Sequence, residues 1–301
     1  MPALAQATGP TLQVTPPRIE QDLRTRSFSV EVSFRNNGTA PTSATFAVTG
    51  LGHDLDGEPQ LPPPAPGPGT ARLDASSARL APGEVRRVTL RGTVPPGAGG
   101  VYAGVVATLA PTPASGGGGV TITQRLASLV LLRGPKPWNE AVAVETVAAR
   151  PTAAGRTVQV FAQVRNAGNV HVRPAGRADV IHRGKVLTTV ELKPDVVIPG
   201  FARRIGGPWT VPAGLDGPVR LVVQIDEPSP ASGRGEVVFE NGRLASVPEG
   251  LGLGPVGGTS LDDTEGSGDA GRVVLSVVGV LLLVGLVVSL VLVARRRAGD
   301  G

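Results

Sequence analysis

The three histidines of the chain, His53, His171 and His182, are the side chains best suited to exchange protons near neutral pH. A hydrolytic site needs a serine and an acid beside the histidine, and no G-x-S-x-G motif is present. No H-E-x-x-H motif occurs either. The chain has no cysteine, which excludes thiol nucleophiles, thiolate metal sites and disulfides. We therefore expect surface histidines in a protein that is not an enzyme and uses no cofactor or metal.

A short acidic cluster, residues 54–58, is the segment richest in possible metal ligands. Its acids Asp54, Asp56 and Glu58 resemble the opening of a calcium-binding loop. However, Gly57 comes before the third acid, and no glutamate stands at the twelfth position of such a loop. The sequence therefore favours a turn that carries Asp and Gly over a calcium site.

Two arginine pairs, Arg86-Arg87 and Arg203-Arg204, are the candidates for binding an anion. Guanidinium groups form forked hydrogen bonds to carboxylates and phosphates, so these residues could contact an anionic polymer. Alternatively, their charge protects the edge of a solvated strand from aggregation. The chain holds 29 Lys+Arg and 24 Asp+Glu, and the net charge of +5 is too small to indicate a nucleic acid partner.

The arginine pairs belong to an internal repeat. Residues 81–97 and 198–214 share Pro-Gly, Arg-Arg, Val-Pro and a final Gly at matching positions without a gap. Upstream of these blocks, residues 30–38 and 158–168 both end in Arg-Asn-x-Gly. Two matching blocks in the same order indicate two copies of one domain.

Each copy contains short segments in which apolar and polar side chains alternate. Phe28, Val30, Val32 and Phe34 alternate with polar residues, which predicts an antiparallel strand with one buried face. The other predicted strands are 43–49, 87–91, 101–109, 120–132, 158–164, 178–181, 186–192, 219–225 and 236–239. We therefore predict an all-β fold with two tandem immunoglobulin-like β-sandwich domains, at residues 10–134 and 141–246.

Segments rich in proline or glycine separate these elements. Residues 135–140 are the predicted linker between the sandwiches, and their prolines limit bending. Residues 61–69 predict a stiff loop because proline has no N–H donor, and residues 115–119 predict a flexible hairpin tip. The Gly-rich, acidic residues 247–271 predict a stalk.

An uncharged apolar segment follows the predicted stalk. At about 1.5 Å per residue it is long enough to cross a hydrocarbon core of about 30 Å, which predicts a transmembrane α-helix at residues 272–294. Arginines come directly after it and stay on the cytoplasmic side, so residues 295–301 are a predicted basic cytoplasmic tail. The residues that define this predicted anchor are Val273, Leu282, Ala294, Arg295, Arg296 and Arg297.

This orientation predicts a single-pass protein of the cell membrane with most of the chain outside. Export of an N-terminal portion normally requires a signal peptide. Residues 5–7, Ala-Gln-Ala, have the form of a cleavage site, although no apolar stretch precedes them. Residues 1–9 are therefore the expected remainder of a signal peptide, and an unrelated Ala-rich N-terminus is the alternative.

The order of parts resembles the WxL-interacting proteins of Gram-positive surfaces. Residues 12–23, 101–109 and 122–132 resemble their first domain, and residues 165–176 and 197–215 resemble their second. The resemblance implies a membrane-anchored binding or adhesion protein of the bacterial surface, with peptidoglycan or surface proteins as partners. The alternative is a structural accessory subunit of a membrane transport or secretion assembly.

Overall fold

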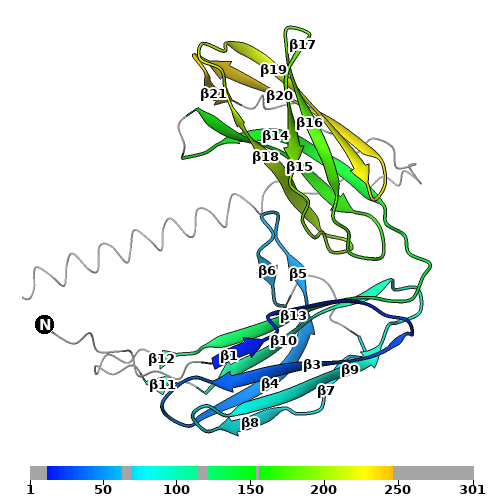
Figure 1. Cartoon of the computed structure of the whole chain (residues 1–301), viewed down its shortest axis with the longest axis vertical. Coiled ribbons are helices and arrows are strands. Elements are labelled where there is room, and N and C mark those ends of the chain that lie inside the picture. Colours follow the sequence, from blue (N-terminus) through cyan, green and yellow to red (C-terminus); the bar gives the residue numbers. More distant parts are fainter. Residues whose placement is uncertain (1–11, 63–68, 111, 114–120, 154–155, 247–301) are drawn as a thin grey trace, which may run out of the picture. The chain divides into compact units, whose positions relative to one another are not determined.

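Strands are the regular secondary structure of the computed structural model, which describes residues 12–62, 69–110, 112–113, 121–153 and 156–246. Within these ranges no helix occurs, so the predicted all-β fold is confirmed. The strands pair into two sandwiches, β1 to β13 and β14 to β21 (Figure 1). We refer to them as the first and the second sandwich.

The first sandwich has a four-stranded sheet and a five-stranded sheet. The four-stranded sheet has the order β1 (Leu12–Thr15), β3 (Ser27–Asn36), β9 (Val85–Thr93) and β7 (Arg72–Leu73). The five-stranded sheet has the order β2 (Arg18–Asp22), β13 (Arg125–Arg133), β10 (Gly100–Leu109), β4 (Thr42–Gly50) and β8 (Ser77–Leu80). Two small hairpins complete it, β5 (Gly52–His53) with β6 (Pro59–Gln60) and β11 (Thr112–Pro113) with β12 (Thr121–Ile122).

The second sandwich has a three-stranded sheet and a five-stranded sheet. The smaller has the order β14 (Val142–Pro151), β15 (Thr157–Asn166) and β18 (Ala202–Thr210). The larger has the order β17 (Lys185–Leu192), β16 (Ala175–His182), β19 (Gly217–Glu227), β20 (Ala231–Glu240) and β21 (Arg243–Ser246). β15 and β18 occupy the places that β3 and β9 occupy in the first sandwich, as the repeat predicts.

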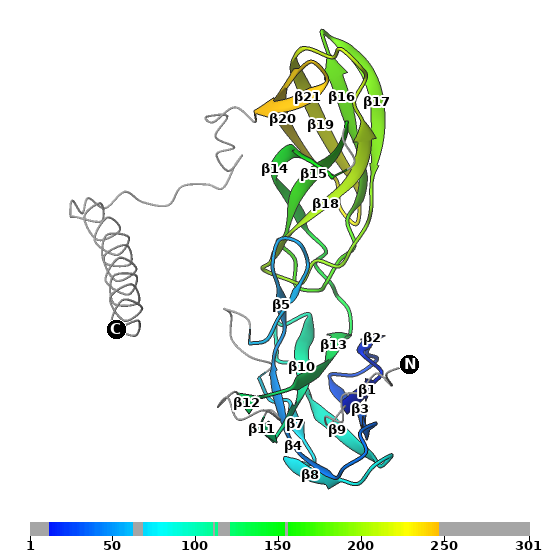
Figure 2. The same ribbon diagram turned by 90° about the vertical axis from the view of Figure 1, so that its left-hand side faces the viewer.

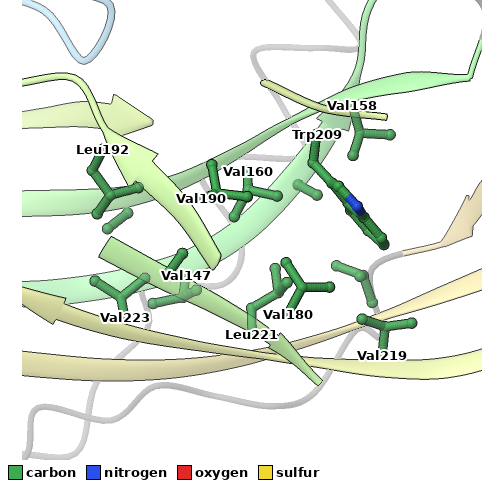
Figure 3. Close-up of a cluster of buried hydrophobic side chains, with 14 of the residues drawn as sticks. Val147, Val158, Val160, Val180, Val190, Leu192, Trp209, Val219, Leu221 and Val223 are labelled. Carbon is green, nitrogen blue, oxygen red and sulfur yellow. The ribbon is translucent and has the colours of Figure 1, made fainter. Parts of the chain in front are cut away.

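Alternation of apolar residues builds both cores. In β3 the four predicted core residues are buried while their neighbours face outward, and β15 has the same pattern. Phe34 packs on Phe46 in the first core, and Trp209 packs edge-on against Phe239 in the second. Figure 3 shows valine and leucine side chains from both sheets facing one another in the second core, with Trp209 at one side of the cluster.

Four of the strands that the sequence did not predict have features that hide the period-two pattern. β14 contains a bulge between Val144 and Thr146, which shifts the alternation halfway along the strand. β18 contains Gly206, Gly207 and Pro208, residues that usually weaken or end a strand. β1 and β2 are separated only by a proline pair and join different sheets, a switch that period-two alternation does not indicate.

Several predicted segments lie outside the described residues. These are the N-terminal segment 1–9, most of the loop 61–69, the hairpin tip 115–119, the stalk, the transmembrane segment 272–294 and the tail 295–301. Among the residues that the structure does describe, no helix is long and apolar enough to cross a bilayer.

Candidate protein-binding site

The repeated Arg-Asn-x-Gly motif places a fully buried asparagine at the end of β3 and of β15. The amide of Asn36 donates to the carbonyl oxygens of Ala40 and Leu80 at 2.9 and 3.1 Å. Asn166 donates to Val170 and Val197 at 2.8 Å each. In both copies the side-chain oxygen accepts the N–H of the glycine two residues later. The motif is therefore a buried clasp that binds two separate segments of the chain.

The arginine pairs occupy equivalent register positions but have different surroundings. Arg86 lies opposite Phe34 on β3, and Arg203 lies opposite the matching Val164 on β15. Arg86 and Arg87 are exposed, and Arg87 has only a 3.5 Å ion pair with Glu31. The predicted anionic-polymer contact therefore stays a prediction for this pair.

Arg203 and Arg204 both contact carboxylates within the chain. Arg203 is largely buried and pairs with Asp195 at 2.6 Å. Arg204 donates to both carboxylate oxygens of Asp56 at 3.2 Å, and its backbone N–H donates to Leu55 O at 2.8 Å. Since Leu55 and Asp56 lie in the β5–β6 hairpin of the first sandwich, Arg204 joins the two sandwiches.

A polar network centred on Glu20 makes a second connection between the sandwiches. Arg173 donates to both carboxylate oxygens of Glu20 at 2.6 Å, and a His171 ring nitrogen lies 3.0 Å from the same carboxylate. Tyr102 Oη accepts the backbone N–H of His171 at 2.6 Å, and Arg133 donates to the His171 carbonyl oxygen at 2.8 Å. Strands β2, β10 and β13 of the first sandwich thus hold the segment before β16.

Two pKa values in this network are shifted downward, for different reasons. The pKa of Glu20 falls to about 2, chiefly because Arg173 donates hydrogen bonds to its carboxylate. Burial lowers the pKa of His171, because the charged imidazolium loses its hydration. His171 is therefore neutral at pH 7, and Glu20 is ionised.

An apolar cluster lies within the same contact. Leu51 and Leu131 of the first sandwich pack with Val196 and Ile198 of the second, and all four are buried. The partly buried side chains around them are Leu61, Tyr102, Leu129 and Phe201. Both sandwiches fall within one compact unit, residues 1–254. We call the two polar connections and this apolar cluster the interdomain contact.

The prediction of surface histidines is wrong for His53 and His171, which are 6% and 1% exposed. Both lie in the interdomain contact, where the neighbouring sandwich covers them. His53 Nε2 accepts the backbone N–H of Ile198 at 3.1 Å, so its Nδ1 donates to Asp54 O at 2.8 Å. Burial lowers the pKa of His53 as well.

The acidic cluster at residues 54–58 forms the predicted turn. The Asp54 carboxylate accepts the backbone N–H groups of Asp56 and Glu58 at 2.9 Å, whereas Asp56 pairs with Arg150 and Arg204. Across the described residues, no group of histidine and acidic side chains is arranged to hold a metal ion. The cluster lies in the β5–β6 hairpin, residues 52–60, which contacts Arg150 and Arg204 of the second sandwich. We call these residues the docking hairpin.

We expect Gly57→Ala to loosen this hairpin. Gly57 has φ +88°, and a Cβ atom there would overlap the Arg203 guanidinium. Backbone strain and the clash together should lower the free energy of unfolding by about 2 kcal/mol in chemical denaturation. The matched control is Gly83→Ala, with φ +77° but open space around the site, which should cost about 1 kcal/mol. Equal losses of unfolding free energy in the two variants would show that the contact between the hairpin and Arg203 does not contribute to stability.

Strand β17 offers an open sheet edge on the second sandwich. Among the described strands it pairs with β16 alone, and it lies at the margin of its sheet (Figure 2). Val186 and Leu187 near its start are 58% and 40% exposed. Among the described residues the third large exposed apolar side chain is Val85, on the first sandwich. Exposed apolar residues on a strand with one free edge are suited to binding an extended segment of another protein.

Sequence reasoning missed the interdomain contact and the β17 edge. The residues of the interdomain contact lie far apart in the chain, as Glu20 and Arg173 do, and patterns within a single sequence do not pair them. One available signal was the presence of residues 51–62 between two strands of the first copy. A second signal was the pair Val186-Leu187, two adjacent apolar residues that break the alternation of apolar and polar side chains in the strand.

The structural comparisons match chaperones of fimbriae. The class 5 fimbriae chaperone CfaA is 10% identical, with a TM-score of 0.42, over 74% of this chain and 98% of its own. The E. coli chaperone DraB is 16% identical, with a TM-score of 0.35, over 76% and 98%. The periplasmic chaperone SfaE is 11% identical, with a TM-score of 0.31, over 74% and 98%. Likenesses at this level assign no function.

No family model and no curated protein matches the chain. The resemblance to WxL-interacting proteins is therefore corrected, since the solved structures that match are fimbrial chaperones. The predictions that rested on it, a membrane-anchored adhesion protein of the cell wall and a single-pass membrane localisation, are contradicted by the same comparisons.

Proposed function

We propose that the chain is a non-enzymatic accessory subunit of a secretion or transport assembly, and that it binds a partner protein through its sandwiches. Both sandwiches are immunoglobulin-like domains in this proposal. The observation that carries it is the open β17 edge with its exposed Val186 and Leu187. An extended segment of the partner adds to β17 as a further strand and covers both side chains.

The interdomain contact supports a binding role for the two sandwiches as one body. Its bidentate ion pair, apolar cluster and docking hairpin connect the sandwiches at separate points. When a partner binds to both sandwiches, the sandwiches then lose little freedom to move relative to each other. This preorganisation strengthens the affinity.

The polar groups around a cavity between the sandwiches support a role without catalysis. This cavity has a volume of about 480 Å³, and His53, Gln163 and Arg165 are among its lining residues. Both ring nitrogens of His53 are hydrogen-bonded, and Arg165 is held by Glu145 and by Gly200 O. These groups are committed to structural contacts and are not poised for proton transfer.

The test is recovery of a partner by the full chain as bait, with and without Val186→Lys and Leu187→Lys together. Two lysines on the edge oppose strand addition by charge and desolvation. We expect the double variant to recover at least about tenfold less of a protein that the unaltered chain recovers after crosslinking. Ser232→Lys with Ala245→Lys, at exposed positions of β20 and β21 at the other end of the same sheet, is the charge-matched control and should retain recovery. Equal recovery by both variants would refute the β17 site.

A further inference from the structure

The outward side of the sheet β1-β3-β9-β7 collects exposed arginines. Arg87 and Arg91 alternate with buried Val88 and Leu90, so both point outward on β9. Arg72 lies directly opposite Arg91, which places like charges side by side. The fourth of these side chains, Arg35, also faces outward, near the start of β9.

Few acids of the chain compensate these charges. Among the described residues, Arg35, Arg72 and Arg91 have no hydrogen-bonded or ion-paired side-chain partner, and Arg87 has only the exposed contact with Glu31. Two further carboxylates lie nearby. Asp74 accepts the backbone N–H of Thr89 at 2.8 Å and interacts electrostatically with Arg91, and Glu84 accepts the backbone N–H of Ala81 at 2.8 Å.

The edge of β9 beside Arg87 is also open. β7 pairs only with Leu90 and Arg91, so within the part of the chain that the structure describes residues Val85–Val88 pair with β3 alone. The N–H of Thr89 points away from β3, because it donates to Asp74. N–H directions alternate along an antiparallel strand, so the N–H of Arg87 points outward too. We call residues Val85–Val88 the open β9 edge.

The second sandwich shows what occupies the matching position. Arg204 is the register equivalent of Arg87, and its N–H donates to Leu55 O while its guanidinium binds Asp56. Arg165, the equivalent of Arg35, is neutralised by Glu145. An acidic hairpin from outside that sandwich therefore fills a position at which no described residue binds on the first sandwich.

We propose that the open β9 edge, with Arg35, Arg87 and Arg91, binds an acidic segment of a partner protein. A backbone carbonyl of that segment accepts the Arg87 N–H, and its carboxylates bind the guanidinium groups in forked hydrogen bonds. This extends the proposed function, because it names the chemistry of the partner at a second surface.

The test titrates the full chain with a glutamate decapeptide, a glutamine decapeptide and inorganic polyphosphate at equal chain length. We expect the glutamate peptide to bind, the glutamine peptide not to bind, and the Arg87 amide to gain protection from hydrogen exchange. Arg87→Ala with Arg91→Ala should weaken glutamate binding at least tenfold. The charge-matched control, Arg220→Ala with Arg234→Ala on the second sandwich, should change it less than twofold.

Equal weakening in both double variants would show general charge attraction and overturn the proposal. Tighter binding of polyphosphate than of the glutamate peptide would indicate an anionic polymer as the occupant and would also overturn it, as would an unprotected Arg87 amide. This titration is independent of the partner-recovery experiment. Loss of recovery in the β17 variant together with no glutamate binding would leave the proposed function standing and reject this surface alone.

Discussion

We expect Asn36→Ala to lower the free energy of unfolding by about 3 kcal/mol, and Asn166→Ala to have a similar effect. Each substitution leaves two carbonyl oxygens without the amide that binds them, and removes the acceptor of a glycine N–H. Buried polar groups that lose their partners cost about 1–3 kcal/mol each, and alanine cannot replace any of these bonds. Since the site is fully buried, water does not readily take the place of the amide.

Chemical denaturation of the full chain measures this effect. Asn37→Ala is the matched control, because Asn37 is exposed and its side chain bonds only to Gln13. The control should cost less than about 1 kcal/mol. Losses of the same size for Asn36 and Asn37 would show that the buried clasp contributes little. Losses at Asn36 and Asn166 that differ severalfold would show that the two copies use the motif differently.

Acidification is expected to weaken the interdomain contact in two steps. The folded pKa values of His53 and His171 lie below the usual 6.5, so the unfolded chain takes up protons first as the pH falls below about 6.5. The stability that the neutral histidines provide is complete above this pH and decreases below it. The folded pKa of Glu20 is about 2 against 4.5 when unperturbed, so its contribution is complete above pH 4.5 and is lost as the pH falls towards 2.

Unfolding midpoints in denaturant, measured between pH 8 and pH 3, test this expectation. Glu20→Gln should be less stable than the unaltered chain at pH 7, and its loss of stability below pH 4.5 should be shallower. His171→Gln should reduce the slope between pH 6.5 and 5. A steeper acid loss in Glu20→Gln, or unchanged slopes in both variants, would assign the acid sensitivity to other groups.

Local patterns in the sequence were enough for the strands that have one buried face. The side chains of β3 and β15 alternate without interruption, and both segments were predicted from that alternation. β14 and β18 were missed because a bulge and a Gly-Gly-Pro segment remove the pattern that period two requires. The repeat was predictable because an asparagine binds separate segments of the chain in the same way in both copies. Both copies therefore share the motif Arg-Asn-x-Gly.

The environment of the candidate residues was not predictable in the same way. Arg87 and Arg204 have the same place in the repeat. Arg87 is exposed to solvent, whereas Arg204 binds Asp56 of a hairpin that is distant in the sequence. His171 became a buried group because the partner residues Glu20 and Tyr102 come from the other sandwich. Such contacts depend on how the sandwiches meet, and composition or periodicity within either copy carries no information about that.

The docking hairpin also bears on how a chain of two copies could have diverged. Only the first copy carries the Asp56 hairpin, and only the second uses its matching arginine to receive it. After a duplication, such a contact makes each copy dependent on its own position. A chain with the two copies exchanged, or with either copy present twice, would not reproduce the Asp56–Arg204 contact in its present form. The order of the sandwiches is thus part of the fold, because the hairpin and the arginine that receives it belong to different copies.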